Sequence, residues 1–164
     1  MKLPGYKKKQ LFDELISPHL PVDLKNYIYV EPFGGTFAVA SYLPEKPKLL
    51  VYNDHVTHDF DLEALPDVEY HVDYTEILKK YDKPDVIFYL DPPYVDKENW
   101  YKYPTGVYDF SHHRLFNAIC EIKNAKVLIS YEKNDGILKM YKDFKIFMYE
   151  GKRQNFRNEM LIVK

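Results

Sequence analysis

The sequence predicts an α/β fold: a doubly wound, mostly parallel sheet of seven strands that ends in an antiparallel strand pair. Short apolar runs are rich in β-branched and aromatic residues, and helical patterns lie between most of them. The apolar runs are nearly continuous, as in strands that are buried on both faces of a parallel sheet. Alternation of strand and helix then favours right-handed crossovers, with helices on both sides of the sheet.

The individual elements follow from these patterns. Strands are expected at residues 27–30, 48–53, 68–72, 86–90, 126–131, 144–149 and 159–163. Helices are expected at residues 8–16, 37–43, 74–81, 112–123 and 135–141. The last two strands are joined by residues 150–158, which are too few for a parallel crossover, so they should pair antiparallel. Residues 95–111 are the least regular stretch and are expected to form a loop.

Length and composition indicate a single domain over residues 1–164. A chain of this length buries enough apolar surface to fold alone, and no repeat or low-complexity tract divides it. No apolar stretch approaches the roughly 20 residues of a membrane span, so no membrane partner is expected. The single cysteine, Cys120, excludes an internal disulfide framework and favours a reducing compartment, so we expect a cytoplasmic protein.

The charge balance is weak evidence against a polyanionic partner, since the sequence contains 23 Lys and Arg residues and 25 Asp and Glu residues. The basic residues are nevertheless clustered, with Lys7, Lys8 and Lys9 near the start and Lys152, Arg153 and Arg157 near the end. A local basic face therefore stays possible. The histidines lack the spacing that is typical of metal ligands, and no metal site is expected.

The most specific feature is the tetrapeptide Asp91-Pro92-Pro93-Tyr94, directly after the apolar strand at 86–90. Ligands of open α/β sheets bind outside the carboxyl ends of the strands, so the tetrapeptide stands where chemistry is expected. The prolines restrict the backbone and hold the Asp91 carboxylate and the Pro92 carbonyl as rigid acceptors, which suits an amino group. Tyr94 adds a ring on which a flat base can stack. The alternative is a strand-terminating turn without chemistry.

A glycine turn follows the first strand, in the segment Glu31-Pro32-Phe33-Gly34-Gly35. Glycines at such a turn let a ligand approach the backbone, and the Glu31 carboxylate can accept from a cationic or hydroxyl group. The segment lacks the pattern of a phosphate cradle, so it favours a nucleotide without phosphates. A glycine turn without a ligand is the alternative.

Acidic residues also follow the second and third strands. Asp54 comes 19 residues after Gly35, at the position where an acid typically hydrogen-bonds to the hydroxyls of a ribose. Asp73 and Tyr74 follow the third strand and can present a carboxylate and a ring to an adenine. Each of the two acids can equally be a helix N-cap.

These segments, in this order, resemble the Dam-like D12 class of N6-adenine-specific DNA methyltransferases over nearly the whole chain. The start of the chain, with Lys7, resembles the family's Pro-Gly-Gly-Lys motif, which contacts the cofactor. Residues 31–37 resemble its Glu-Pro-Phe-x-Gly-x-Gly cofactor loop. Asp54 matches the ribose-binding acid, and Asp73-Tyr74 matches the Asp-Phe pair beside the cofactor adenine. Asp91 to Tyr94 match the catalytic Asp-Pro-Pro-Tyr motif.

The resemblance implies the class I methyltransferase fold, S-adenosylmethionine as cofactor, and DNA as partner. The target adenine would be flipped out of a duplex or lie in a single strand. The sequence departs from the motifs at Tyr6 and Phe37, which stand where the family has glycines. Only about 60 residues separate Glu31 from Asp91, so the family's inserted target recognition domain does not fit there, and low sequence specificity is expected. A specificity partner or self-association is left open.

Methyl transfer to an exocyclic amine is difficult because the lone pair of the amine is delocalised into the ring. If Asp91 and the Pro92 carbonyl accept both N–H hydrogens, the lone pair is localised towards the methyl group, and catalysis is mainly positioning and electrostatics. The aromatic and basic stretch 95–108, which contains Trp100 and Tyr101, is the element expected to close over the base. The alternative is an ordinary surface loop that is packed by its own aromatic residues. Two alternatives stay open: the same chemistry on RNA adenine or cytosine N4, and a non-catalytic cofactor-binding or nucleic-acid-binding subunit that has kept the fold.

Overall fold

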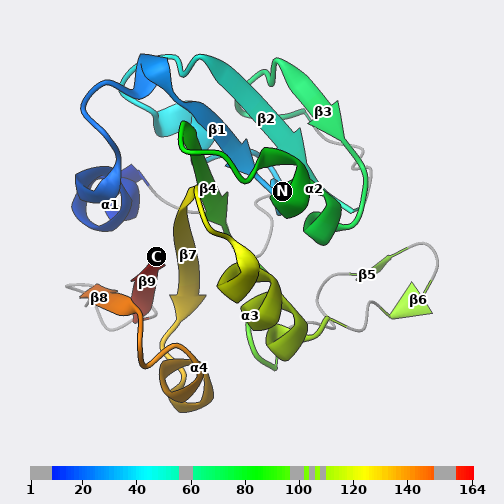
Figure 1. Ribbon diagram of the computed structural model, residues 1–164. Helices are drawn as coiled ribbons and strands as arrows, with labels where there is room; N and C mark the ends of the chain where they lie inside the picture. Colours follow the sequence, from blue (N-terminus) through cyan, green and yellow to red (C-terminus); the bar gives the residue numbers. More distant parts are fainter. Residues whose placement is uncertain (1–8, 56–60, 97–101, 104–105, 108–109, 150–157) are drawn as a thin grey trace.

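The structure is a computed structural model that describes residues 9–55, 61–96, 102–103, 106–107, 110–149 and 158–164. Its centre is a seven-stranded sheet in the order β3-β2-β1-β4-β7-β9-β8 (Figure 1). The strands are β1 (Ile28–Glu31), β2 (Leu49–Asn53), β3 (Val68–Tyr70), β4 (Val86–Leu90), β7 (Lys126–Glu132), β8 (Lys145–Tyr149) and β9 (Glu159–Val163). The predicted seven-stranded α/β sheet is therefore confirmed.

The sheet is parallel from β3 to β7, and β9 pairs antiparallel with both β7 and β8. The predicted terminal antiparallel pair is thus confirmed. The chain moves outward from β1 to β3 and then returns to the other side of β1 to form β4. This reversal of strand order makes the crevice outside the carboxyl ends of β1 and β4 the place where an open α/β sheet binds its ligands.

Helices cover both faces of the sheet. On one face lie α2 (Tyr74–Tyr81), α3 (His112–Glu121) and α4 (Asp135–Met140), which pack against strand residues such as Val30 and Phe88. On the other face lie α1 (Lys9–Leu11), η1 (Phe12–Ile16), η2 (Ser17–His19), η3 (Leu24–Asn26) and η4 (Ala40–Tyr42). These segments pack against strand residues such as Tyr29 and Tyr89, which belong to a second hydrophobic core on this face. Because successive residues of a strand point to opposite faces, the continuous apolar runs supply both cores.

The helix that the sequence predicts at residues 37–43 is wrong, since only the 3-10 turn η4 forms there. Phe37 has a φ of 60°, in the left-handed region, and a right-handed helix cannot continue through that conformation. Pro44 follows closely and restricts the residue before it to extended conformations. Residues 32–39 therefore form turns beside the carboxyl end of β1.

The helices near this edge begin at side-chain caps. The Asp73 carboxylate accepts the Thr75 N–H at the start of α2, and Ser111 Oγ accepts the Arg114 N–H at the start of α3. Part of the loop expected at residues 95–111 is a short antiparallel pair, β5 (Lys102–Tyr103) and β6 (Gly106–Val107). Within the described ranges, no helix has the length and apolar character needed to cross a membrane.

Candidate active site

The loops that follow β1, β2 and β3 contact one another at the carboxyl edge of the sheet. Gly35 donates its backbone N–H to Asp54 Oδ2 at 2.9 Å, although 19 residues separate the two. The ring centroids of Phe33 and Tyr74 lie 5.0 Å apart. Residues that the sequence singled out on three separate loops are therefore neighbours in the structure.

Asn53 is a residue of this site that sequence reasoning missed. It is fully buried at the end of β2. Its Nδ2 donates to the Pro32 carbonyl at 2.9 Å and to the Val72 carbonyl at 3.2 Å, and its Oδ1 accepts the Val72 N–H at 3.1 Å. One side chain thus fixes the loops on both sides of β2. The available signal was a polar residue that closes an otherwise apolar strand.

The turn after β1 uses its two glycines differently. No side chain fits at Gly34, because an added Cβ would lie 2.3 Å from the Tyr52 ring. Gly35 has a φ of 50°, and an added Cβ would meet nothing within 4 Å. Tyr52 Oη donates to the Gly35 carbonyl at 3.1 Å and holds the turn in place. Because Gly35 has no side chain and is partly exposed, a ligand can approach the backbone of the turn closely at this residue.

Phe37 stands where the resembling family has a glycine, and it keeps a left-handed backbone. Its φ of 60° costs a residue with a side chain about 1 kcal/mol or more. Its ring is fully buried and packs edge-on against Tyr52, with centroids 5.2 Å apart. Burial of the ring offsets the strain, so the departure from glycine adds core packing next to the turn.

Glu31 ends β1 as a buried carboxyl group that is only 2% exposed. Tyr29 Oη donates to Glu31 Oε1 at 3.1 Å. Burial raises the pKa of Glu31 well above its ordinary value, and the nearby Asp91 charge adds to this, against hydrogen bonds from Tyr29 and the Ala40 backbone. A cationic group of a ligand would stabilise the charged form of this buried acid.

Asp73 forms an ion pair with Arg114 of α3. Arg114 donates hydrogen bonds from Nη1 to Asp73 Oδ2 at 2.8 Å and from Nη2 to Asp73 Oδ1 at 3.0 Å. Burial raises the pKa of Asp73, but hydrogen bonds from Arg114 and Thr75 outweigh this effect and lower the pKa to about 2. The structure therefore gives Asp73 the helix-capping role, and any bond to a cofactor has to share the carboxylate with Arg114.

Tyr74 belongs to an aromatic cluster with Phe33 and Phe110. The centroid of the Phe110 ring lies 5.7 Å from that of Phe33 and 6.0 Å from that of Tyr74. The Arg114 guanidinium carbon lies 5.1 Å from the centre of the Tyr74 ring. Tyr74 is only 2% exposed, so this cluster forms an apolar wall at the start of α2.

The tetrapeptide from Asp91 to Tyr94 continues directly from β4, at the point where the strand order reverses. Asp91 is partly exposed, whereas Pro92, Pro93 and Tyr94 are buried. Tyr94 Oη donates to the two carboxylate oxygens of Glu159 at 2.8 and 3.0 Å. Nothing in the sequence pointed to Glu159, which lies 65 residues further along the chain.

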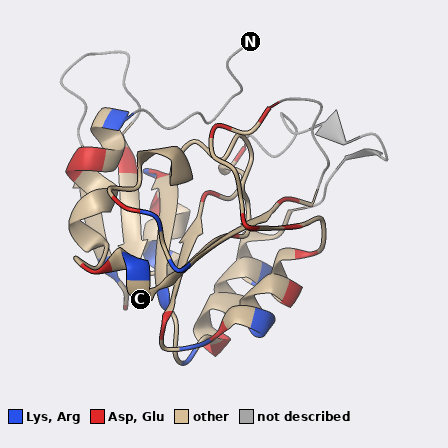
Figure 2. Ribbon diagram, turned by 90° about the horizontal axis from the view of Figure 1, so that it is seen from above, with Lys and Arg blue, Asp and Glu red and all other residues tan. Residues whose placement is uncertain are grey.

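Lys7 lies outside the described residues, as do Trp100 and Tyr101 of the expected covering loop. No cluster of three or more His, Cys, Asp or Glu residues that could hold a metal ion occurs in the part of the chain that the structure describes. Figure 2 shows basic and acidic segments interspersed on the described helices.

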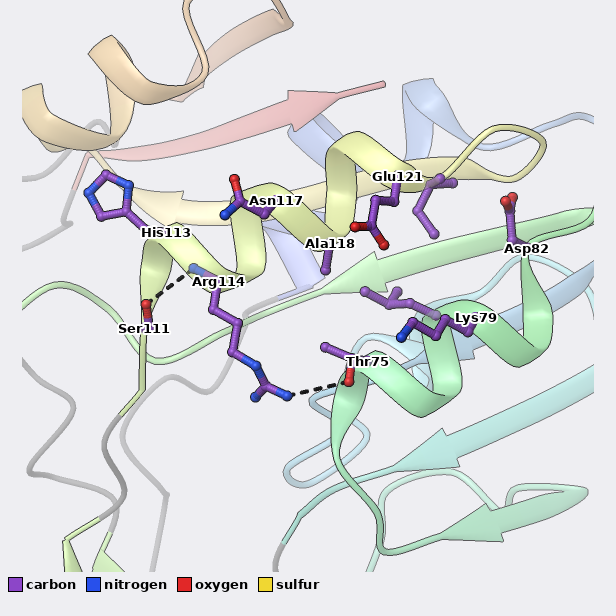
Figure 3. A pocket seen from close by; sticks show the side chains of 11 residues that line it. Thr75, Lys79, Asp82, Ser111, His113, Arg114, Asn117, Ala118 and Glu121 are labelled. Carbon is purple, nitrogen blue, oxygen red and sulfur yellow. Dashed lines mark hydrogen bonds between the residues drawn. The ribbon is translucent and has the colours of Figure 1, made fainter.

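A groove of about 680 Å³ runs between α2 and α3 (Figure 3). Arg114 extends from α3 across it to Thr75, whose Oγ1 accepts a hydrogen bond from Nη2 at 3.4 Å. Neither the glycine turn nor the segment from Asp91 to Tyr94 lines this groove. It is therefore separate from the site at the carboxyl edge.

The strand order, the glycine turn after β1 and the segment after β4 define an S-adenosylmethionine-dependent methyltransferase. Residues 59–155 match the D12 class N6 adenine-specific DNA methyltransferase family. The match spans more than half of the chain, and the chain belongs to this family. The prediction of the family, and with it of S-adenosylmethionine as cofactor, is confirmed. No curated protein matches the chain.

Solved structures share the fold. YhhF from Escherichia coli, assigned as a methyltransferase, has a TM-score of 0.56 at 12% identity, covering 99% of this chain and 91% of that one. An rRNA methylase from Streptococcus thermophilus has a TM-score of 0.55 at 13% identity, covering 85% and 87%. A third, SMU.776, assigned as a methyltransferase and complexed with SAH, has a TM-score of 0.53 at 13% identity, covering 86% and 45%. At these identities the likeness establishes the methyltransferase fold.

Proposed function

We propose that this chain transfers a methyl group from S-adenosylmethionine to the N6 amino group of adenine in DNA. The observation that carries the proposal is the position of the segment from Asp91 to Tyr94. It lies at the carboxyl end of β4, the parallel neighbour of β1, and within the part of the chain that matches the family.

The residues of the first three loops suit S-adenosylmethionine, which supplies the methyl group when bound. Glu31 is a buried acid that a cationic group would stabilise, and Gly35 is partly exposed and lacks a side chain, so a nucleoside can approach its backbone. Asp54 uses Oδ2 for the Gly35 N–H, and a carboxylate has capacity for further donors such as ribose hydroxyls. Lys7, Pro32, Phe33, Gly34, Asp73 and Tyr74 complete the proposed cofactor site.

The segment after β4 suits an exocyclic amine. Asp91 is partly exposed and carries a carboxylate that accepts hydrogen bonds, while the buried Pro92 and Pro93 hold the backbone in place. Acceptance of both amine hydrogens, by Asp91 and by the Pro92 carbonyl, localises the lone pair of the amine. Two fixed acceptors beside the amine stabilise the positive charge that develops on its nitrogen.

We also infer that the chain acts as a single catalytic domain with low intrinsic sequence specificity. The connections between β1 and β4 are occupied by β2, β3 and α2, which leaves no segment for an inserted recognition domain. Sequence in duplex DNA is read mainly through contacts to base edges, and a chain without an inserted recognition domain would make few of these contacts. DNA is the proposed partner, either as a duplex with a flipped adenine or as a single strand.

The test is incubation of the chain with methyl-labelled S-adenosylmethionine and either DNA or RNA, followed by digestion to nucleosides. The proposal predicts N6-methyladenine in the DNA digest and little label in RNA. Preferential label in RNA, or in N4-methylcytosine, would change the substrate while keeping the chemistry. Absence of label from every nucleic acid would favour a non-catalytic role.

A further inference from the structure

We propose that Glu159 of β9 is a positioning residue that orients the Tyr94 ring for the target base. The inference rests on the proposed function, because it concerns the ring that follows the Asp91 carboxylate in the same segment. It adds a residue from the C-terminal strand to a site whose proposed catalytic residues follow β4.

The contact is close and carries a charge. Tyr94 has one hydroxyl hydrogen, which both oxygens of Glu159 share at 2.8 and 3.0 Å. A hydrogen bond to an ionised carboxylate is about twice as strong as one between neutral groups. Tyr94 is 7% exposed and Glu159 is partly exposed, so the bond lies at the edge of the core.

The sheet fixes the position of Glu159. In the antiparallel pairing of β7 with β9, Glu159 lies opposite Glu132, the last residue of β7. The carboxyl end of β7 lies on the same edge as that of β4, since these two strands are parallel neighbours. Residues 160–162 of β9 are fully buried, so the strand that carries Glu159 is anchored in the core.

The ring of Tyr94 is therefore held at both ends. Its backbone follows Pro92 and Pro93, whose rings restrict φ, and its hydroxyl is bound to a strand of the sheet. The Tyr131 ring lies 6.4 Å away, and its hydroxyl is hydrogen-bonded to Nδ1 of His112 at 2.9 Å. A tyrosine side chain has only two ring-orienting torsions, so fixing the backbone and the hydroxyl sets the plane on which a base can stack.

Orientation of this ring affects the rate, because a misplaced base moves its amine away from the line of methyl transfer. Small displacements of reacting groups lower rates by large factors. The alternative is that Glu159 only tethers β9 to the loop after β4. A tether would change the stability of the fold and leave the rate of the folded enzyme unchanged.

The experiment is a double-mutant cycle on the full chain, with methyl transfer to DNA, cofactor affinity and thermal unfolding measured for each variant. We expect E159A and Y94F each to lower kcat by about 10-fold or more. The double variant should be no slower than either single variant, because both changes break the same bond. E159Q should keep kcat within about 3-fold of wild type, because its amide oxygen still accepts from the hydroxyl. Calorimetry should show unchanged affinity for S-adenosylmethionine.

E132A is the matched control, since it removes a carboxylate from the neighbouring position of the same edge without removing the Tyr94 bond. If E159A does not fold, E159M takes its place, because it fills a similar volume without an acceptor. Two results would overturn the inference. One is that the losses in kcat of E159A and Y94F multiply in the double variant, and the other is that E159A has the kcat of wild type. An inactive wild-type chain would overturn the proposed function itself, and the inference with it.

Discussion

Arg114 donates two parallel hydrogen bonds to Asp73, at 2.8 and 3.0 Å, and joins α3 to the start of α2 across 41 residues. A bidentate pair of this kind adds energy and directionality to the ion pair. It lies between the aromatic cluster of Phe33, Tyr74 and Phe110 and the groove between the two helices. The pair therefore connects this aromatic cluster, beside which the cofactor is expected, to α3. That helix follows the loop that is expected to cover the target base.

This pair should make stability sensitive to acid. The folded pKa of Asp73, about 2, lies below its ordinary 3.8, so the stabilisation is present above 3.8 and is lost as pH falls through 2. R114A should lower the free energy of unfolding at pH 7 by about 1 kcal/mol, since Arg114 is half exposed and solvent screens the pair. R114K keeps the positive charge and should lower the free energy of unfolding by less. Urea unfolding at pH 7 and pH 2 measures both effects, and equal losses at the two pH values would contradict the assignment.

The opposite pH dependence is expected at Glu31. Its folded pKa is raised above the ordinary value of 4.5, so the folded state binds the proton more tightly than the unfolded state. The stabilisation is complete below 4.5 and is lost as pH rises towards the raised folded pKa. E31Q removes this titration, so its stability relative to wild type should increase from pH 4 to pH 8, while its affinity for S-adenosylmethionine should fall. A constant difference in stability across this range would show that Glu31 is not protonated in the fold.

Phe37 allows the backbone strain to be separated from the packing. F37A loses the buried ring and keeps a side chain at a φ of 60°, whereas F37G loses the ring and relieves the strain. Both should destabilise the protein by several kcal/mol, about 3 or more for the alanine variant. F37G should be the more stable of the two by about 1 kcal/mol, the reverse of the usual rank of alanine and glycine. Denaturant unfolding measures the difference, and F37A as the more stable variant would mean that the turn is not left-handed.

The proposed lack of a recognition domain predicts methylation in short or degenerate sequence contexts. Phosphate contacts and base stacking hold DNA without reading much sequence, and binding through phosphates weakens steeply with salt. Activity should therefore fall strongly with added salt and be higher on single-stranded or easily opened DNA. Sequencing of the methylated positions on a genome-length DNA tests this. A single motif of about six or more base pairs, methylated by the chain alone, would contradict it.

The strands were predictable because their apolar runs are continuous and their ends are marked by polar residues or proline. The strand at Val86–Leu90 was placed to the residue. The helix expected at residues 37–43 failed because the conformation of Phe37 depends on its packing against Tyr52, which no local pattern encodes. The acid and glycine motifs located the carboxyl edge. The residues that hold those motifs in place, Asn53 and Glu159, act through contacts distant in sequence and were not predicted.

The central claim is that Asp91 accepts a hydrogen of the target amine, and the direct measurement is single-turnover methyl transfer to DNA by wild type and D91A. The carboxylate is assigned to the target and not to the cofactor, so D91A should bind S-adenosylmethionine with nearly wild-type affinity by calorimetry. Its rate of N6-methyladenine formation should fall by roughly 100-fold or more, the usual cost of a lost transition-state hydrogen bond. D91N, which keeps one acceptor oxygen, is the matched control, and its rate should lie between those of wild type and D91A. A D91A variant that forms N6-methyladenine at the wild-type rate would contradict this account.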